Sequence, residues 1–412
     1  MLGGETQEVI IVGAGLSGLS CALELQANNY KVLVLEQSDG PGGRVRTDEV
    51  DGYLLDRGFQ VYLDAYPIAG QVFDLPDLKL SAFEPGAMVF SEGKLHRFMD
   101  AFRRPRYLFA SVFAPVGNFF DKVMLARLRT RLLHLPIDKI TENEDLVTTD
   151  YLRRHGFSER MIDGFFRSFY GGIFLERDLH TSSRMFEFTF KMFAQGLATL
   201  PAKGMGQLPE QLASRLGQDQ IQYNTKVASI SGNEVHLQNG KILAAHSVVV
   251  ATPPDTAKRL LPSLQMPSTA WRSTTNLYFS ADKSPLNEPV LALNGEKTGL
   301  VNSVAVLSDV CPSYAPEGKA LISVSLLGIP EQDDLPNLVS QELTKWFGSE
   351  VLTWTHLRTD TIPCALPEQT PDSSPCPQPP PPHFLCGDYQ ISTSIEGAII
   401  SGQETAQRIL AQ

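Results

Sequence analysis

Cysteine is scarce in this sequence, and its pattern sets a first limit. The five cysteines are Cys21, Cys311, Cys364, Cys376 and Cys386. No two of them form a C-x-x-C pair, and no histidines cluster near them. This pattern indicates neither a disulfide framework nor a zinc site, so we expect no bound metal.

The sequence also lacks long apolar runs and a positive net charge. No stretch of about 18 apolar residues could span a bilayer. Polar residues 3–8 lead directly into the first apolar segment without the pattern of a signal peptide, so we expect a cytoplasmic protein. The net charge of −11 argues against nucleic acid as a partner.

The composition is that of an ordinary globular protein. The chain has 412 residues, of which 42% are hydrophobic and 20% are charged. It is too long for one ordinary domain, so we expect two intertwined domains with a large core.

The first strong pattern is a glycine-rich turn between a strand and a helix. Val9–Val12 is a β-branched apolar run that predicts a strand buried on both faces, and Gly13, Gly15 and Gly18 follow at G-x-G-x-x-G spacing. From Leu16, apolar residues recur at helical spacing. Gly13 would form the tight turn, Gly15 would let the backbone approach a pyrophosphate, and Gly18 would let the helix pack close to the strand.

A second strand and an acidic residue complete a dinucleotide-binding pattern. Val32–Leu35 predicts a buried strand that ends at Glu36, whose carboxylate would accept hydrogen bonds from a ribose diol. The phosphates would lie at the helix N-terminus, where free N–H groups and the helix dipole favour anions. FAD and NAD share this pattern. The predicted cofactor residues of this segment are Gly13, Ala14, Gly15, Leu16, Ser17, Gly18, Glu36 and Gln37.

The residues after Glu36 distinguish the two cofactors. Gly42, Gly43, Arg44 and Thr47 form a G-G-R-x-x-[ST] run, in which the glycines expose N–H groups and Arg44 adds a guanidinium fork suited to a pyrophosphate. This run resembles the signature of the flavin-containing amine oxidase superfamily, which includes monoamine oxidases, protoporphyrinogen oxidase and phytoene desaturase. We therefore predict that Gly42, Gly43 and Arg44 contact FAD.

A segment near the C-terminus resembles a second flavin motif of the same family. The strand-like residues 384–386 precede Gly387 and Asp388, and a helix is expected to begin a few residues later. The resemblance implies that the Asp388 carboxylate binds a ribityl hydroxyl and that N–H groups near Gly397 and Ala398 face the O2 edge of the flavin. The predicted cofactor residues here are Gly387, Asp388, Glu396, Gly397 and Ala398.

Weaker resemblances add three positions. Asp56, Gly58 and Phe59 match a D-x-G segment that lies beside the flavin ring in this family, although a hairpin corner is the alternative interpretation. Val227 matches a residue whose backbone pairs with adenine. We predict cofactor contacts for Gly58, Phe59 and Val227.

The resemblance covers essentially the whole chain and implies its fold class. We expect an α/β protein with a Rossmann-type FAD-binding domain, of the p-hydroxybenzoate hydroxylase-like kind, and an interleaved α+β substrate domain of the amine oxidase type. The FAD-binding domain is predicted to be discontinuous, formed by residues 1–80, 200–265 and 380–412. The substrate domain is predicted to comprise residues 81–199 and 266–379.

One part of the predicted substrate domain, residues 94–134, is basic and rich in phenylalanine. It carries nine Lys and Arg residues against Asp100 and Asp121, together with six phenylalanines. From Asp121 to Leu133, apolar and basic residues alternate, which suits a helix in an anionic membrane interface. A helix that covers the core with solvated arginines is the alternative. Residues 94–134 are thus a candidate membrane-contacting segment of a peripheral protein.

The resemblance implies that the flavin performs the chemistry. In this family hydride passes from a substrate carbon to flavin N5, oxygen or a quinone reoxidises the flavin, and a catalytic dyad is not required. We leave the catalytic residue unassigned, because the titratable candidates His155, His180 and Glu187 are of kinds that more often have structural roles. FAD is predicted to be non-covalent, because the surroundings of Cys364 and Cys376 do not match those of the tethering cysteine in monoamine oxidases.

Two positions bear on the substrate. Amine oxidases of the family place a lysine near N5 and an aromatic cage around the amine. Here the matching strand reads T-T-N-L-Y-F without lysine, and the cage position is Ser394. We therefore expect an FAD-dependent oxidoreductase closer to the desaturase and protoporphyrinogen oxidase branch, acting on a lipophilic isoprenoid, carotenoid or tetrapyrrole. The alternatives are an amine or amino-acid oxidase that releases hydrogen peroxide, and a flavin-dependent isomerase or non-turnover flavin-binding protein.

Overall fold

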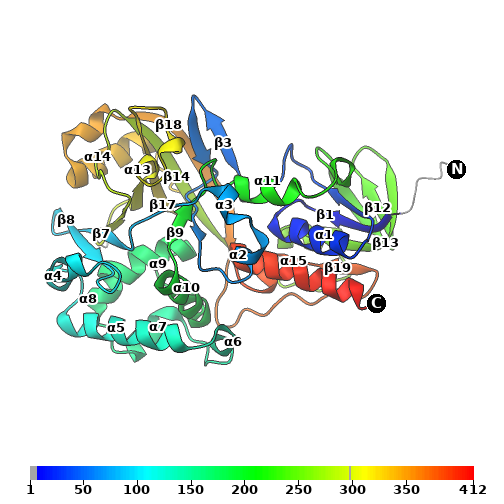
Figure 1. Cartoon of the computed structure of the whole chain (residues 1–412), viewed down its shortest axis with the longest axis horizontal. Coiled ribbons are helices and arrows are strands. Elements are labelled where there is room, and N and C mark those ends of the chain that lie inside the picture. The colour runs from blue at the N-terminus through cyan, green and yellow to red at the C-terminus, as the bar shows by residue number, and fades with distance from the viewer. Residues whose placement is uncertain (1–6, 297) are drawn as a thin grey trace.

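The computed structural model describes residues 7–296 and 298–412. Its two large sheets lie in different halves of an elongated molecule (Figure 1). The first strand and the last helix lie together in the half at the right of that view. The chain therefore crosses into the other half and returns.

The first sheet brings together strands from the start, middle and end of the chain. Its strands are β1 (Gln7–Val12), β2 (Val32–Leu35), β10 (Ile221–Gln222), β11 (Val227–Ser231), β12 (Glu234–Leu237), β13 (Ile242–Val250) and β19 (His383–Leu385). They follow the order β10-β2-β1-β13-β12-β11, with β19 paired to β13. β10, β2, β1, β13 and β19 are parallel, whereas β11, β12 and β13 pair antiparallel. The predicted strands Val9–Val12 and Val32–Leu35 are confirmed.

β1 is buried on both faces, which explains its unbroken apolar sequence. Val9 and Ile11 belong to the core beneath α1 (Leu16–Ala27) and α15 (Ile395–Leu410). Ile10 and Val12 belong to a second core, which also contains residues of α12 (Pro254–Leu260). Successive side chains of a strand point to opposite faces, so each core receives alternate residues.

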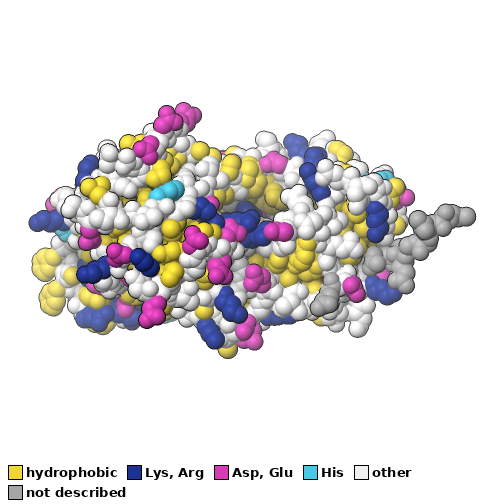
Figure 2. All heavy atoms as spheres, turned by 90° about the horizontal axis from the view of Figure 1, so that it is seen from above, with side chains coloured by type: hydrophobic (Ala, Val, Ile, Leu, Met, Phe, Trp, Pro, Cys, Tyr) yellow, Lys and Arg dark blue, Asp and Glu magenta, His cyan; other side chains and the backbone are white. Residues whose placement is uncertain are grey.

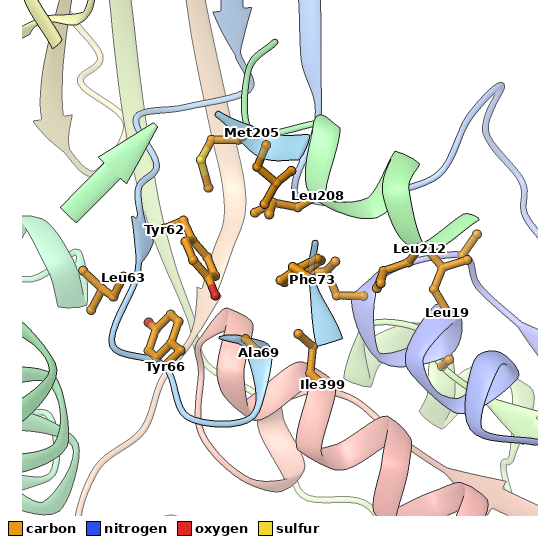
Figure 3. Packing of buried hydrophobic residues seen from close by; sticks show 14 of the residues in the cluster. Leu19, Tyr62, Leu63, Tyr66, Ala69, Phe73, Met205, Leu208, Leu212 and Ile399 are labelled. Carbon is orange, nitrogen blue, oxygen red and sulfur yellow. The ribbon is translucent and has the colours of Figure 1, made fainter. Parts of the chain in front are cut away.

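The two helices on the first sheet pack very closely. A Cβ on Gly402 of α15 would stand 2.2 Å from the Ser17 carbonyl oxygen of α1, so no larger residue fits there. The Ser20 hydroxyl donates to the Ile399 carbonyl at 3.1 Å across the same contact. Figure 3 shows the adjoining core, in which Phe73 lies between Leu208 of α11 (Gln207–Ala213) and Ile399.

The second sheet is mostly antiparallel. Its strands are β7 (Gly86–Ser91), β8 (Lys94–Met99), β14 (Trp271–Ala281), β15 (Leu291–Asn294), β16 (Val301–Val306), β17 (Ala320–Leu327) and β18 (Thr355–Pro367). They follow the order β18-β14-β17-β16-β15-β7-β8, in which β15 and β7 are parallel. One face packs against α14 (Leu335–Phe347), where the rings of Phe90 and Trp346 stack 5.0 Å apart.

The opposite face of the second sheet looks towards a helical layer. α9 (Arg167–Phe174) contacts β15, β16 and β17 directly. α5 (Phe119–His134), α7 (Thr148–Arg154) and α10 (Ser183–Gln195) lie beyond α9, around a core that includes Phe166 and Phe186 (Figure 1). The remaining elements are β3 (Thr47–Val50), β4 (Tyr53–Asp56), β5 (Tyr62–Leu63), β6 (Ser81–Ala82), β9 (Ala198–Leu200), α2 (Ala69–Val72), α3 (Leu75–Leu78), α4 (Leu108–Phe113), α6 (Ile137–Ile140), α8 (Glu159–Met161) and α13 (Leu307–Val310).

Two strands of the second sheet end next to other kinds of structure. β16 ends at Val306, because Leu307 begins α13. β18 runs to Pro367 and so includes the first residues of the proline-rich stretch 363–382. A proline is tolerated there because β18 lies at the edge of its sheet.

A buried carboxylate joins β4 to the second sheet. Asp56 is 1% exposed and accepts hydrogen bonds from the Met205 N–H at 2.9 Å and from the hydroxyls of Thr47 and Tyr314. Its backbone carbonyl accepts from the Tyr278 hydroxyl of β14. Burial raises the pKa of Asp56 to about 6, although its hydrogen bonds act in the opposite direction.

This raised pKa predicts a pH-dependent effect of the substitution Asp56→Asn. Between about pH 4 and about pH 6 the folded state holds more protons than the unfolded state, so the contribution of Asp56 to stability falls as the pH rises through this window. Asparagine has no such transition. The destabilisation caused by Asp56→Asn should therefore be larger at pH 4 than at pH 7.5, by up to about 3 kcal/mol, in denaturant unfolding.

The exposed carboxylate of Asp138 provides the matched control. Asp138→Asn should change the unfolding free energy by a similar small amount at both pH values. If the loss of unfolding free energy caused by Asp56→Asn is the same at pH 4 and at pH 7.5, the raised pKa of Asp56 is contradicted.

Candidate functional site

A single large cavity links the two halves of the molecule. Its volume is about 1340 Å³, and its lining extends from the turn after β1 to the helical face of the second sheet. Fifteen of the residues predicted from the sequence line it: Gly13, Gly15, Leu16, Ser17, Glu36, Gln37, Gly42, Gly43, Arg44, Gly58, Phe59, Val227, Gly387, Asp388 and Ala398. Ala14, Gly18, Glu396 and Gly397 are not among the lining residues.

The three glycines of the first turn have different surroundings. Gly13 has a φ of +113°, and a Cβ there would stand 2.6 Å from the Ala251 carbonyl oxygen. A Cβ on Gly18 would stand 2.0 Å from the Gly13 carbonyl oxygen, so Gly18 serves close helix packing. A Cβ on Gly15 would meet nothing within 4 Å, and Gly15 lines the cavity. The backbone at Gly15 is thus the part of the turn that a phosphate could approach.

The start of α1 offers free hydrogen-bond donors to the cavity. The backbone N–H groups of Leu16 and Ser17 have no partner within the described residues, and both residues line the cavity. Gly15, the N-cap, has no side chain that could satisfy them. Unpaired N–H groups and the positive end of the helix dipole favour an anion at this position.

Glu36 is held rigidly beside this turn. One carboxylate oxygen accepts from the Ala14 N–H at 2.8 Å, and the other accepts from the N–H and hydroxyl of Ser38 at 2.8 and 2.7 Å. The Thr225 N–H donates to the Glu36 carbonyl at 2.8 Å, which brings the chain leading to Val227 alongside. Three of about four acceptor positions of the carboxylate are used by the protein, so one remains for a ligand hydroxyl.

The second glycine turn lies against the first. The Gly42 N–H donates to the Ala14 carbonyl at 2.8 Å, and a Cβ on Gly43 would stand 3.8 Å from the Gly15 Cα. The two glycine turns, each predicted to contact a pyrophosphate, are therefore adjacent.

Arg44 links this turn to the C-terminal motif. Its guanidinium forms an ion pair with the Asp388 carboxylate at 2.6 Å and donates to the Ala365 carbonyl at 3.2 Å. The sequence predicts one cofactor contact for Arg44 and a separate one for Asp388. In the structure each of the two charged groups is oriented by the other, and both line the cavity.

The start of α15 differs from the sequence prediction in one respect. The Gly397 N–H donates to the Ser394 hydroxyl at 2.9 Å and the Ala398 N–H to the Ser394 carbonyl at 3.0 Å, so these two N–H groups are already satisfied. In the described residues the N–H groups of Ile395 and Glu396 have no partner, because Ser394 is the N-cap. The donors available to a ligand are thus two residues earlier in the chain than predicted.

The Glu396 side chain is not part of the cavity lining. Its carboxylate accepts from the N–H groups of Ile68 and Ala69 at 2.9 and 2.8 Å and is 1% exposed. Burial raises the pKa of this carboxyl, against the effect of the two N–H groups. Glu396 therefore anchors the loop before α2, and only its backbone is available to the site.

Several lining residues were not predicted from the sequence. Arg259 lines the cavity and donates at 2.9 Å to the carbonyl of Ala228, the residue after Val227. Ile362 and Ala365 of β18 line the cavity beside the predicted flavin segment, and a Cβ on Gly58 would stand 2.6 Å from Ile362. No local motif marks these residues, because their positions depend on strand pairing between distant segments.

The far part of the cavity is an apolar chamber. Its walls carry aromatic and aliphatic side chains from α9, α10, β15 and neighbouring segments, including Phe165, Phe169, Phe190, Phe193, Leu291 and Leu293. From β14, whose sequence includes T-T-N-L-Y-F, Thr274 lines this cavity. Among the described residues that line the cavity, one is a lysine, namely Lys122. It belongs to α5, the helix after α4, and not to β14.

The titratable candidates named from the sequence lie outside the cavity lining. Glu187 accepts hydrogen bonds from the Tyr151 hydroxyl and the Asn143 amide and pairs with Arg131. His155 stacks on the Tyr151 ring, and His180 is exposed. All three have surroundings that suit structural roles.

Together these features fit FAD. The open face of Gly15, the free N–H groups of α1 and the remaining acceptor position of Glu36 form a cradle for a ribose and a pyrophosphate. Arg44 and Asp388 would hold the region between the pyrophosphate and the ribityl chain.

The role of Glu36 generates a test. Glu36→Arg should yield protein without FAD, because the substitution removes the acceptor and places a cation where the ribose hydroxyls would bind. Glu36→Gln keeps one carbonyl oxygen and should retain part of the FAD. The measurement is the FAD released on denaturation per chain, with the unfolding midpoint as a control for folding. A folded Glu36→Arg protein with full FAD content would refute the assignment.

The chain is similar to known proteins over most of its length. The profile of the flavin containing amine oxidoreductase family matches residues 16–410. The 15-cis-phytoene desaturase of Narcissus pseudonarcissus is 24% identical over 98% of this chain and 79% of its own length. The coproporphyrinogen III oxidase of Propionibacterium freudenreichii is 26% identical over 64% of this chain and 60% of its own. A structure described as a putative protoporphyrinogen oxidase from Exiguobacterium sp. 255-15 has a TM-score of 0.77 at 18% identity, with both chains fully covered. Because the profile spans nearly the whole chain, this protein belongs to the flavin-containing amine oxidoreductase family.

Proposed function

We propose that this flavin-containing oxidoreductase uses non-covalent FAD to dehydrogenate a lipophilic small molecule, such as an isoprenoid, a carotenoid or a tetrapyrrole. Residues 1–80, 200–265 and 380–412 would hold the cofactor, and residues 81–199 and 266–379 would hold the substrate. The electron acceptor in this proposal is oxygen or a quinone. The relatives named phytoene desaturase and coproporphyrinogen oxidase support this choice of substrate class.

The observation that carries the proposal is the continuity of the cavity. The same space is lined by Gly15 and Arg44 at one end and by Phe169 and Leu293 at the other. A bound flavin supplies an acceptor for a hydride or an electron pair taken from carbon. The apolar walls would hold the substrate by burial of its surface and exclude water from the reacting carbon.

Two positions that would mark an amine site carry other residues. β14, from which Thr274 lines the cavity, has no lysine in its sequence T-T-N-L-Y-F, and Ser394, at the position expected for a cage tyrosine, serves as the N-cap of α15. An ammonium group would therefore lose cation–π stabilisation of roughly 0.5 to 2 kcal/mol per ring. The chamber favours a neutral, apolar substrate over an amine.

An exposed apolar patch surrounds one mouth of the cavity. Its members are Phe102, Leu108, Phe109, Phe113, Phe119, Phe120 and Val123, which are between 38% and 80% exposed. Phe102, Leu108 and Val123 also line the cavity, so the mouth opens within the patch. In Figure 2 hydrophobic side chains gather at the left end of the molecule, where Figure 1 places α4 and β8. We propose that this patch lies on a lipid surface from which the substrate enters.

The positive charge of residues 94–134 contributes less to membrane binding than the sequence suggested. Five of the nine basic residues form ion pairs with carboxylates, one of which lies within the segment: Arg97, Arg104, Arg106, Arg129 and Arg131. α5 also does not divide into one apolar and one basic face, since Leu128 and Leu132 are buried while Phe119 and Phe120 are exposed. Exposed apolar area therefore carries the membrane proposal. No helix in the described part of the chain is long and apolar enough to cross a bilayer.

The reaction is tested by anaerobic reduction of the purified flavoprotein. Carotenoid precursors or porphyrinogens in detergent should bleach the flavin absorption, whereas amines should not. Dithionite should bleach the flavin in every sample and serves as the control that the flavin is reducible. Bleaching by an amine at a rate above that of every lipophilic compound would overturn the substrate class.

The patch is tested by co-sedimentation with anionic phosphatidylglycerol vesicles at low salt. Phe109→Ser combined with Phe113→Ser should weaken binding at least about tenfold, because two exposed phenylalanines no longer enter the interface. Neither residue lines the cavity, so flavin content should not change. The control variant combines Leu338→Ser with Leu352→Ser, which change two exposed leucines outside the patch. It should sediment like the wild type. Failure of the wild type to sediment would remove the proposal.

A further inference from the structure

The floor of the apolar chamber carries a small group of hydroxyls. Ser303 of β16 and Ser325 of β17 are paired across the two strands, and both line the cavity. Asn302, next to Ser303, also lines it. Their neighbours in the lining, Leu293 and Leu327, are apolar. The floor of the chamber thus combines polar and apolar side chains.

Two of these groups have unused hydrogen-bonding capacity. The Ser303 hydroxyl has no partner among the described residues, although Ser303 is only 5% exposed. Asn302 is 4% exposed, and its amide nitrogen donates to the Ser168 carbonyl at 3.1 Å. No described residue donates to the Asn302 side-chain oxygen. The Ser303 hydroxyl and the Asn302 side-chain oxygen are therefore left without a partner among the described residues, although Asn302 also borders a second, smaller pocket.

A third group is oriented by a buried asparagine. Asn276 of β14 is fully buried, and its side-chain oxygen accepts from the hydroxyls of Ser323 and Ser325, each at 3.0 Å. Ser325 lines the cavity, whereas Ser323 does not. In this orientation of the Asn276 amide its nitrogen has no partner among the described residues, and the Ser325 proton points to the Asn276 oxygen, which leaves the Ser325 oxygen to accept from the chamber. Ser303 and Ser325 thus present a donor and an acceptor side by side.

A pure hydrocarbon would fill this chamber at a cost. It would keep water out and leave the Ser303 hydroxyl without any partner, while the Ser325 oxygen would lack a donor from the ligand side. A site with buried polar groups discriminates against a ligand that lacks the matching oxygen far more strongly than an apolar pocket discriminates between two hydrocarbons.

We infer that the chamber takes an apolar molecule that bears a hydroxyl or carbonyl oxygen, and that Ser303 and Ser325 bind that oxygen. The inference rests on the proposed function, because it concerns the same chamber. The oxygen could belong to the substrate, or to a quinone that accepts the electrons. A hydroxyl uses both the donor and the acceptor, whereas a quinone carbonyl uses the donor alone.

The test compares matched ligands on the oxidised FAD-bound protein. One pair is farnesol and the hydrocarbon in which hydrogen replaces its hydroxyl, and the other is menadione and the matching methylnaphthalene. Binding is followed by perturbation of the flavin spectrum and by calorimetry. At least one oxygenated ligand should bind about tenfold or more tightly than its hydrocarbon. A preference in the farnesol pair assigns the oxygen to the substrate, and one in the menadione pair assigns it to the acceptor.

The variants decide whether the floor is responsible. Ser303→Ala combined with Ser325→Ala should reduce the preference to less than about threefold, and the single variant Ser303→Ala serves if the double variant loses flavin. Ser323→Ala removes the other hydroxyl on Asn276 and should keep the preference. Equal binding within both pairs, or a preference that survives in the serine variants, would overturn the inference. Because the readout is binding without turnover, it is separate from a failure of flavin reduction.

Discussion

The site depends on the close packing of α1 against α15. Gly402 leaves no room for a side chain beside the Ser17 carbonyl, so the last helix of the chain lies directly on the first. This contact brings the C-terminal motif to the glycine turns, and it allows Arg44 to meet Asp388 across 344 residues of sequence. Any larger residue at Gly402 would push the two halves of the cofactor site apart.

The second sheet divides its two faces between stability and function. The face towards α14 is filled with aliphatic and aromatic side chains, including the Phe90–Trp346 pair. The face towards the cavity carries Thr274, Ser303 and Ser325 among leucines. Thr274 donates to the Leu326 carbonyl and Ser325 to Asn276, whereas the Ser303 hydroxyl has no partner among the described residues, and a buried hydroxyl without a partner costs free energy. This unpaired hydroxyl is the reason why we propose a ligand oxygen at this place.

Most residues predicted for the cofactor end of the site line one cavity, because the motifs of the first segment are local. Strand, glycine turn and helix follow each other within residues 9–27, and short-range geometry fixes how they fold. The side-chain role of Glu396 could not be read in this way, because its partners Ile68 and Ala69 lie more than 300 residues away. The pairing of the basic residues in 94–134 and the alignment of Ser303 with Ser325 likewise depend on tertiary contacts and strand register.

The cofactor content of the purified protein tests the FAD site most directly. We expect a flavin absorption spectrum, with close to one FAD per chain released into solution when the protein is denatured by acid. Flavin that stays with the precipitated chain would contradict the non-covalent assignment. A colourless protein that binds a nicotinamide dinucleotide and not FAD would contradict the central claim itself.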